Sequence, residues 1–132
     1  MNAGSGTLTF SESGGTSQGQ LGIGTQNGNE LVLSAAAADI QINIPVINTG
    51  SNAGALLITG PNTVNITSSG GVSTFTGATT VASGTLHVSG VGAINSTSGI
   101  TVNGSGARYL QTSSVASTRL LTLVRGTLDG TG

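Results

Sequence analysis

The side chains that could carry out chemistry are few in this sequence and far apart. Its four carboxylates are Glu12, Glu30, Asp39 and Asp129, and its single histidine is His87. A glycosidase or polysaccharide lyase needs at least two carboxylates in one place, and a triad or metal centre needs a histidine with close partners. Only the stacking of distant segments could bring these groups together. We therefore predict no catalytic residue, no metal site and no cofactor.

Each of these residues also has a structural interpretation. Glu12 and Glu30 are expected on solvated turns, and Asp39 is expected to shape the corner before Ile40. His87 lies between two apolar residues that are predicted to face inward, so its own side chain should face outward. These four residues are therefore interpreted as parts of a scaffold.

The cations are three arginines in the last quarter of the chain, Arg108, Arg119 and Arg125. With a net charge of −1 and no lysine, the chain offers no basic face for a phosphate backbone, so we predict no nucleic-acid partner. Arg108 and the only tyrosine, Tyr109, are neighbours and form a candidate contact patch that could stack on a sugar or touch a protein.

The sequence also predicts no membrane span and no signal peptide. The most apolar run, Leu31 to Ile47, is interrupted by polar residues and is too short to cross a bilayer. No basic region followed by an apolar stretch comes after Met1. The absence of cysteine excludes disulfides and thiolate metal sites.

Apolar residues recur with period two in short bursts, which is typical of strands with one buried face. Clusters of Gly, Ser and Asn separate the bursts and predict turns, as at 13–15, 26–29 and 68–71. The four alanines at 35–38 predict a tight corner and not a helix. The bursts are Leu8/Phe10, Leu21/Ile23, Leu31/Leu33, Ile40/Ile42/Ile44, Leu56/Ile58, Val64/Ile66, Leu86/Val88, Ile100/Val102 and Leu121/Leu123.

A pattern of a small residue, Gly, another small residue and alternating apolar positions repeats along the chain. It occurs at 5–10, 53–60 and 83–90, and it begins again at 125–128. Such internal similarity favours a solenoid over a β-sandwich. We predict an all-β fold without substantial helix: one right-handed parallel β-helix over residues 1–132, with about six or seven coils of roughly 20 residues.

Residues 73–90, Ser-Thr-Phe-Thr-Gly-Ala-Thr-Thr-Val-Ala-Ser-Gly-Thr-Leu-His-Val-Ser-Gly, resemble the autotransporter-associated, or passenger-associated, β-strand repeat. The segment Gly99 to Gly104 resembles the strand that follows in that family, so 73–104 is the best-matching repeat unit. The resemblance implies a bacterial secreted or cell-surface protein whose passenger folds as a right-handed parallel β-helix.

The first strand of the predicted stack, Thr7 to Phe10, carries no charge, and the last segment, 126–128, resembles the beginning of the chain, so neither end should be capped. The residues expected at these assembly edges are Thr7, Leu8, Thr9 and Phe10 at one end and Leu121, Leu123 and Leu128 at the other. The sequence therefore predicts that the chain is a structural section of a surface fibre or stalk. Its expected partner is a second copy, stacked head to tail, or the adjoining repeats of one parent chain.

Two other functions remain open from the sequence. An adhesin would bind a host or glycan surface through a flat face or loop of the β-helix. Ice binding would need regular Thr-x-Thr rows, of which 7–9 and 74–76 are examples, but the irregular repeat spacing disfavours such an array.

Overall fold

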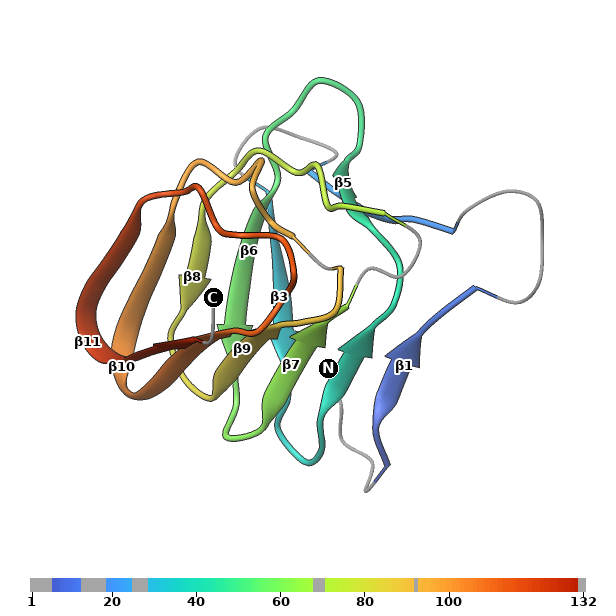
Figure 1. The fold of residues 1–132 in the computed structure, drawn as a ribbon. Helices are drawn as coiled ribbons and strands as arrows, with labels where there is room; N and C mark the ends of the chain where they lie inside the picture. The colour runs from blue at the N-terminus through green and yellow to red at the C-terminus, as the bar shows by residue number, and fades with distance from the viewer. Residues whose placement is uncertain (1–5, 13–18, 25–28, 68–70, 92, 131–132) are drawn as a thin grey trace.

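The chain folds as a parallel β-solenoid, and the residues that the structure describes contain no helix (Figure 1). The structure is a computed structural model that describes residues 6–12, 19–24, 29–67, 71–91 and 93–130. All strand pairs within these ranges are parallel. The strands are β1 (Leu8–Phe10), β2 (Leu21–Ile23), β3 (Glu30–Ser34), β4 (Ile40–Ile42), β5 (Val46–Asn48), β6 (Ala55–Thr59), β7 (Thr63–Ile66), β8 (Thr79–Val81), β9 (Thr85–Val88), β10 (Ile100–Gln111) and β11 (Leu121–Gly130).

The strands stack in three ladders, one for each side of the coil. Ladder A consists of β1, β4, β7, β9 and the second halves of β10 and β11. Ladder B consists of β3, β6, β8 and the first halves of β10 and β11. Ladder C begins with β2 and β5 and continues through irregular segments, where Thr74 N donates to Val46 O at 2.9 Å and Ser73 N to Ala93 O at 3.0 Å. β10 and β11 each bend around the corner between ladders B and A.

The number of coils is lower than the sequence predicted. Between β3 and β11, the two ends of ladder B, the chain makes about four turns. Its registers run from Leu31 through Leu56, Thr79 and Ile100 to Leu121, which makes turns of 25, 23, 21 and 21 residues. The prediction of six or seven coils was too high because the coils are longer than 20 residues and the first step of ladder A, from Leu8 to Ile40, takes 32.

The core is a set of apolar rows that run along the inside of the stack. In β4, β6, β7 and β9, buried residues alternate with partly exposed ones, so the period-two prediction is confirmed for these strands, whereas every residue of the last strand, β11, is exposed. The inner rows of ladder A are Leu8, Ile40, Val64, Leu86, Tyr109 and Leu128, then Phe10, Ile42, Ile66 and Val88; those of ladder B are Leu31, Leu56, Thr79, Ile100 and Leu121, then Leu33, Ile58, Val81, Val102 and Leu123.

Tight corners join ladder B to ladder A, and they stack backbone directly on backbone. Residues 36–38 bend after the buried Ala35, which confirms the predicted alanine corner. One coil further on, Gly60 adopts a φ of +93° directly over Ala35. Next comes Gly84, with a φ of +67°, and a Cβ there would lie 2.3 Å from the carbonyl oxygen of Gly60. The predicted turns at 13–15, 26–28 and 68–70 lie outside the described residues.

Polar side chains on the outer face of ladder A hydrogen-bond from coil to coil. Asn65 Nδ2 donates to Gln41 Oε1 at 3.0 Å, and Asn65 Oδ1 accepts from Ser89 Oγ at 2.8 Å. Thr67 Oγ1 donates to Asn43 Oδ1 at 2.7 Å. These bonds tie consecutive coils together without any ion pair.

Candidate assembly interface

The solenoid is open at both ends, and β1 and β11 lie at opposite ends of the stack (Figure 1). Within the described residues β11 pairs with β10 alone, β1 with β4 alone, β2 with β5 alone and β3 with β6 alone. The outer edges of these four strands therefore present backbone groups that no described strand pairs. An unpaired parallel edge is a template for a further strand.

The C-terminal end exposes positions that are buried in the middle coils. In ladder B, Leu56, Ile58 and Val81 are 0% exposed, whereas Leu121 is 36% and Leu123 is 49% exposed. Leu128, at the top of ladder A, is 37% exposed. These three leucines were predicted to lie at an assembly edge, and they form the uncovered top layer of the core.

A cavity of about 400 Å³ opens beside Leu121 and Leu128. It is the hollow centre of the last coil, which the next layer of side chains would fill. Its walls are mostly apolar, as in an incomplete core. The lining residues are Tyr109, Gln111, Ser113, Ala116, Ser117, Leu121, Leu128, Asp129 and Gly130.

The N-terminal end is less exposed. Leu8 and Phe10 of β1 and Leu31 of β3 are partly buried and pack against the core. Thr7 and Thr9 are exposed, and Thr7 lies just before β1. The first strand thus begins one residue later than the predicted edge at 7–10.

The candidate contact patch of Arg108 and Tyr109 does not form. The two residues are neighbours in a strand, so their side chains point to opposite faces. Tyr109 lies inside the solenoid, 1% exposed, and its hydroxyl donates to Gln111. Arg108 lies on the outer face and pairs with Asp129 at 2.6 Å. No surface ring is left to stack on a sugar, and burial raises the pKa of Tyr109.

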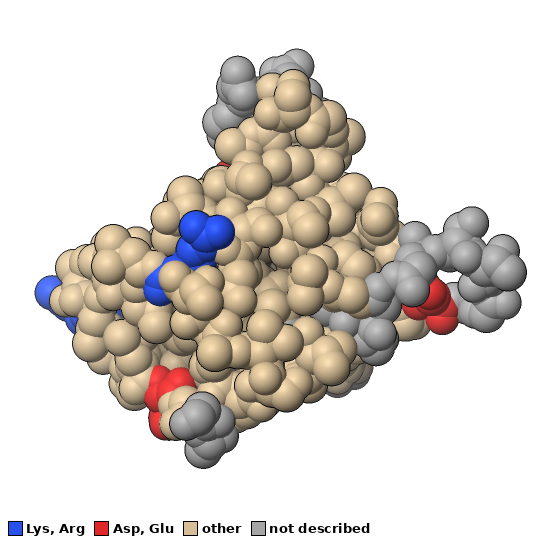
Figure 2. All heavy atoms as spheres, turned by 45° about the horizontal axis from the view of Figure 1, so that its top comes forward, with Lys and Arg blue, Asp and Glu red and all other residues tan. Residues whose placement is uncertain are grey.

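The described residues contain no group of three or more acidic, histidine or cysteine side chains that could hold a metal ion. Asp39 Oδ1 accepts a hydrogen bond from Thr63 N at 2.8 Å, so it fixes the corner before Ile40. Glu12 is exposed, whereas Glu30 is the first residue of β3 and not part of a turn. Figure 2 shows the charges as separate spots on an otherwise uncharged surface.

His87 faces outward from β9, as predicted, and its Nε2 is hydrogen-bonded to Thr112 Oγ1 at 2.6 Å. Partial burial, and then the positive charge of Arg108, hold the pKa of His87 below its ordinary value of 6.5. It is one member of the outer polar rows.

The lowered pKa of His87 predicts a weak pH dependence of stability. Because the unfolded chain binds the proton first, the free energy of unfolding should fall slightly as the pH drops below 6.5. Urea unfolding between about pH 7 and pH 5 measures this change. His87→Gln keeps a hydrogen-bonding side chain there and should abolish the dependence; an unchanged slope would assign it to another group.

No family model, curated protein or solved structure matches this chain. The resemblance of residues 73–104 to the autotransporter-associated repeat therefore stays a prediction. In the structure this segment begins on ladder C, contains β8 and β9, and ends within β10. Among the described residues, no helix is long and apolar enough to span a membrane.

Sequence reasoning found the edge leucines but missed the cavity and its buried tyrosine. The signal was present in the alternation itself, because Arg108 and Leu110 flank Tyr109 as outer residues flank an inner one. The corner at 103–107 shifts the register. The inward direction of Tyr109 could therefore not be obtained by counting alternate residues from Ile100.

Proposed function

We propose that this chain is a structural section of a bacterial extracellular or cell-surface β-solenoid fibre or stalk, which extends by head-to-tail stacking. The observation that supports this proposal is the open C-terminal coil, where Leu121, Leu123 and Leu128 are exposed and an unfilled cavity lies beside Leu121 and Leu128. A further coil, from a second copy or from adjoining repeats of the same parent chain, would bury these side chains and pair the outer edge of β11.

The surface composition supports the same proposal. Only 5% of the residues are charged and the net charge is −1, so little electrostatic repulsion opposes association. The bacterial surface location rests on the resemblance of residues 73–104 to the passenger repeat.

Assembly should depend on the apolar surface of the C-terminal end. In sedimentation velocity and negative-stain microscopy, the wild type is expected to form filaments as its concentration rises. The variant L121D/L128D should require at least about tenfold more protein, because it places charges against the incoming coil. Circular dichroism checks that its fold is unchanged.

The matched control is Val72→Asp, which changes a 51% exposed valine away from both ends. It should assemble like the wild type. Wild-type protein that stays monomeric at every concentration, or a double variant that assembles as readily as Val72→Asp, would contradict the proposed function.

A further inference from the structure

The first described strand and the last part of β11 lie on the same side of the coil, which limits how two copies can stack. At the N-terminal end, successive strands lie on ladder A (β1), ladder C (β2) and ladder B (β3). At the C-terminal end, the last layer runs through ladder C (113–116), ladder B (121–123) and ladder A (127–130). Within the described residues, ladder A therefore contains one more layer than ladder B or ladder C.

Two docked arrangements follow from this order. If β1 of one copy pairs with 127–130 of another, ladders B and C each lack one layer at the junction, and the cavity stays open. If instead β2 and β3 cover 113–116 and 121–123, ladders B and C continue without a gap. In that case β1 of one copy and segment 127–130 of the other would occupy the same position on ladder A, so one of the two must be displaced.

Of the two competitors, β1 is held less firmly. It has three residues, pairs only with β4, and is followed by a 32-residue step to its partner position. Segment 127–130 makes four register pairs with β10, and Asp129 adds the ion pair with Arg108 at 2.6 Å. The inner side chains of β1, Leu8 and Phe10, are only partly buried.

We propose that two copies of this chain join by strand displacement, in which β1 leaves β4 and segment 127–130 of the other copy takes its place. This inference rests on the proposed function and specifies its interface. In the joined pair Ile40 lies over Leu128 and Ile42 over Gly130, while Leu31 and Leu33 cover Leu121 and Leu123. All three ladders then continue through the junction. In the free chain, β1 pairs with the edge of β4 until segment 127–130 of another copy replaces it.

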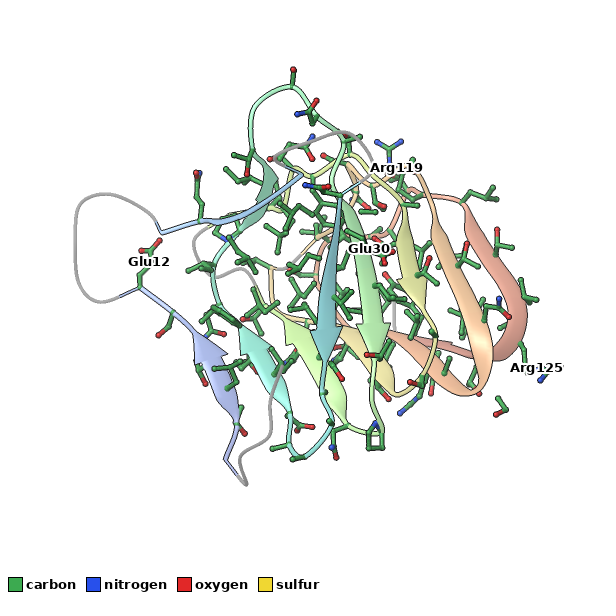
Figure 3. All side chains as sticks on the ribbon, turned by 180° about the vertical axis from the view of Figure 1, so that it is seen from behind. Glu12, Glu30, Arg119 and Arg125 are labelled. Atoms are coloured by element: carbon green, nitrogen blue, oxygen red, sulfur yellow. The ribbon has the colours of Figure 1, made fainter. Side chains whose placement is uncertain are left out.

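The charges at the two ends fit this register. Glu30 precedes Leu31, and Arg119 lies two residues before Leu121. Since Leu31 and Leu121 belong to one row of ladder B, Glu30 of the incoming copy lies one layer above Leu120 and beside Arg119. Figure 3 shows both labelled side chains along the edge where the strands of ladder B begin. Both are exposed, and because Arg119 Nε donates to Asn95 O of the coil below, the terminal guanidinium nitrogens are the groups that would pair with Glu30.

Two proline variants of β1 separate strand displacement from simple end pairing. Leu8 N donates to Asp39 O at 3.1 Å, so Leu8→Pro removes a bond that holds β1 on β4. Alternate residues of a parallel strand bond to opposite sides, so the N–H of Thr9 points away from β4 toward the open end. Thr9→Pro therefore leaves β1 in place and blocks its outer edge.

Light scattering of the full-length chains gives the readout. Under strand displacement, Leu8→Pro should lower the critical concentration for assembly about tenfold, and Thr9→Pro should assemble like the wild type. If Leu8→Pro assembles less readily than the wild type, or Thr9→Pro abolishes assembly, β1 is itself the interface and the inference is overturned while the proposed function stands. If neither the wild type nor Leu8→Pro assembles, the proposed function fails as well.

A charge exchange tests the register independently. Glu30→Arg or Arg119→Glu alone should weaken assembly about two- to fivefold, and the double variant E30R/R119E should restore it. In the other docked arrangement Glu30 lies a full layer, about 4.8 Å, further from Arg119, and no restoration is expected. A double variant that assembles no better than the single variants would overturn the proposed register.

Discussion

Replacing Gly104 by alanine should lower the free energy of unfolding by at least about 3 kcal/mol. Gly104 lies in the corner within β10, and a Cβ there would be 1.9 Å from the carbonyl oxygen of Ala82 in the coil below. That contact is with backbone, which cannot rotate away, so the two coils must separate or one corner must change. Urea unfolding followed by circular dichroism measures the loss.

Gly106 provides the control two residues further along the same strand. A Cβ at Gly106 meets nothing within 4 Å, so Gly106→Ala should change stability by no more than about 0.5 kcal/mol. If the two substitutions cost the same, the effect would come from the intrinsic preferences of glycine, and the close stacking of corners would not explain it.

The second large effect is expected at Leu56, in the inner row of ladder B. Leu56 is 0% exposed, so Leu56→Ala should leave a cavity in the stack and cost about 3 kcal/mol. The neighbouring Leu57 faces outward and is partly exposed, so Leu57→Ala should cost less than about 1 kcal/mol.

The same unfolding measurement applies to both leucine variants. Because they remove the same atoms from adjacent positions, the difference between them isolates the direction in which each side chain points. Equal losses would mean that β6 is not buried on one face only, which would contradict the alternation observed along the strand.

Most strands could be predicted because their signal is local. Each burst of two alternating apolar residues, such as Val64 and Ile66, marks a strand in the structure. β8 lacks such a pair, because its first inner position is Thr79. A buried threonine is tolerated there because its Oγ1 lies 3.1 Å from that of Thr97, which in turn donates to Gly77 O at 2.6 Å. This partner lies 18 residues away, beyond any local pattern.

The candidate site was predicted less completely than the strands. Leu121, Leu123 and Leu128 lie at one end of the described stack, and uncapped ends were expected because the first strand carries no charge and the last segment resembles the beginning. The Arg108–Tyr109 patch was wrong, because two adjacent strand residues cannot share a face. Whether β1 belongs to the interface or covers it remained outside the reach of the sequence.

By itself the sequence determined where strands form, which of their residues face inward, and that such strands stack in parallel as a solenoid. The strands and their inward faces follow from side-chain polarity over a few residues, whereas the solenoid was favoured by the pattern that repeats at 5–10, 53–60 and 83–90. Only the tertiary structure decided the number of turns, the inward position of Tyr109 and the return of both ends to ladder A. These depend on how many residues each corner and step consumes, and a step of 32 residues or a register shift at 103–107 leaves no local pattern to read.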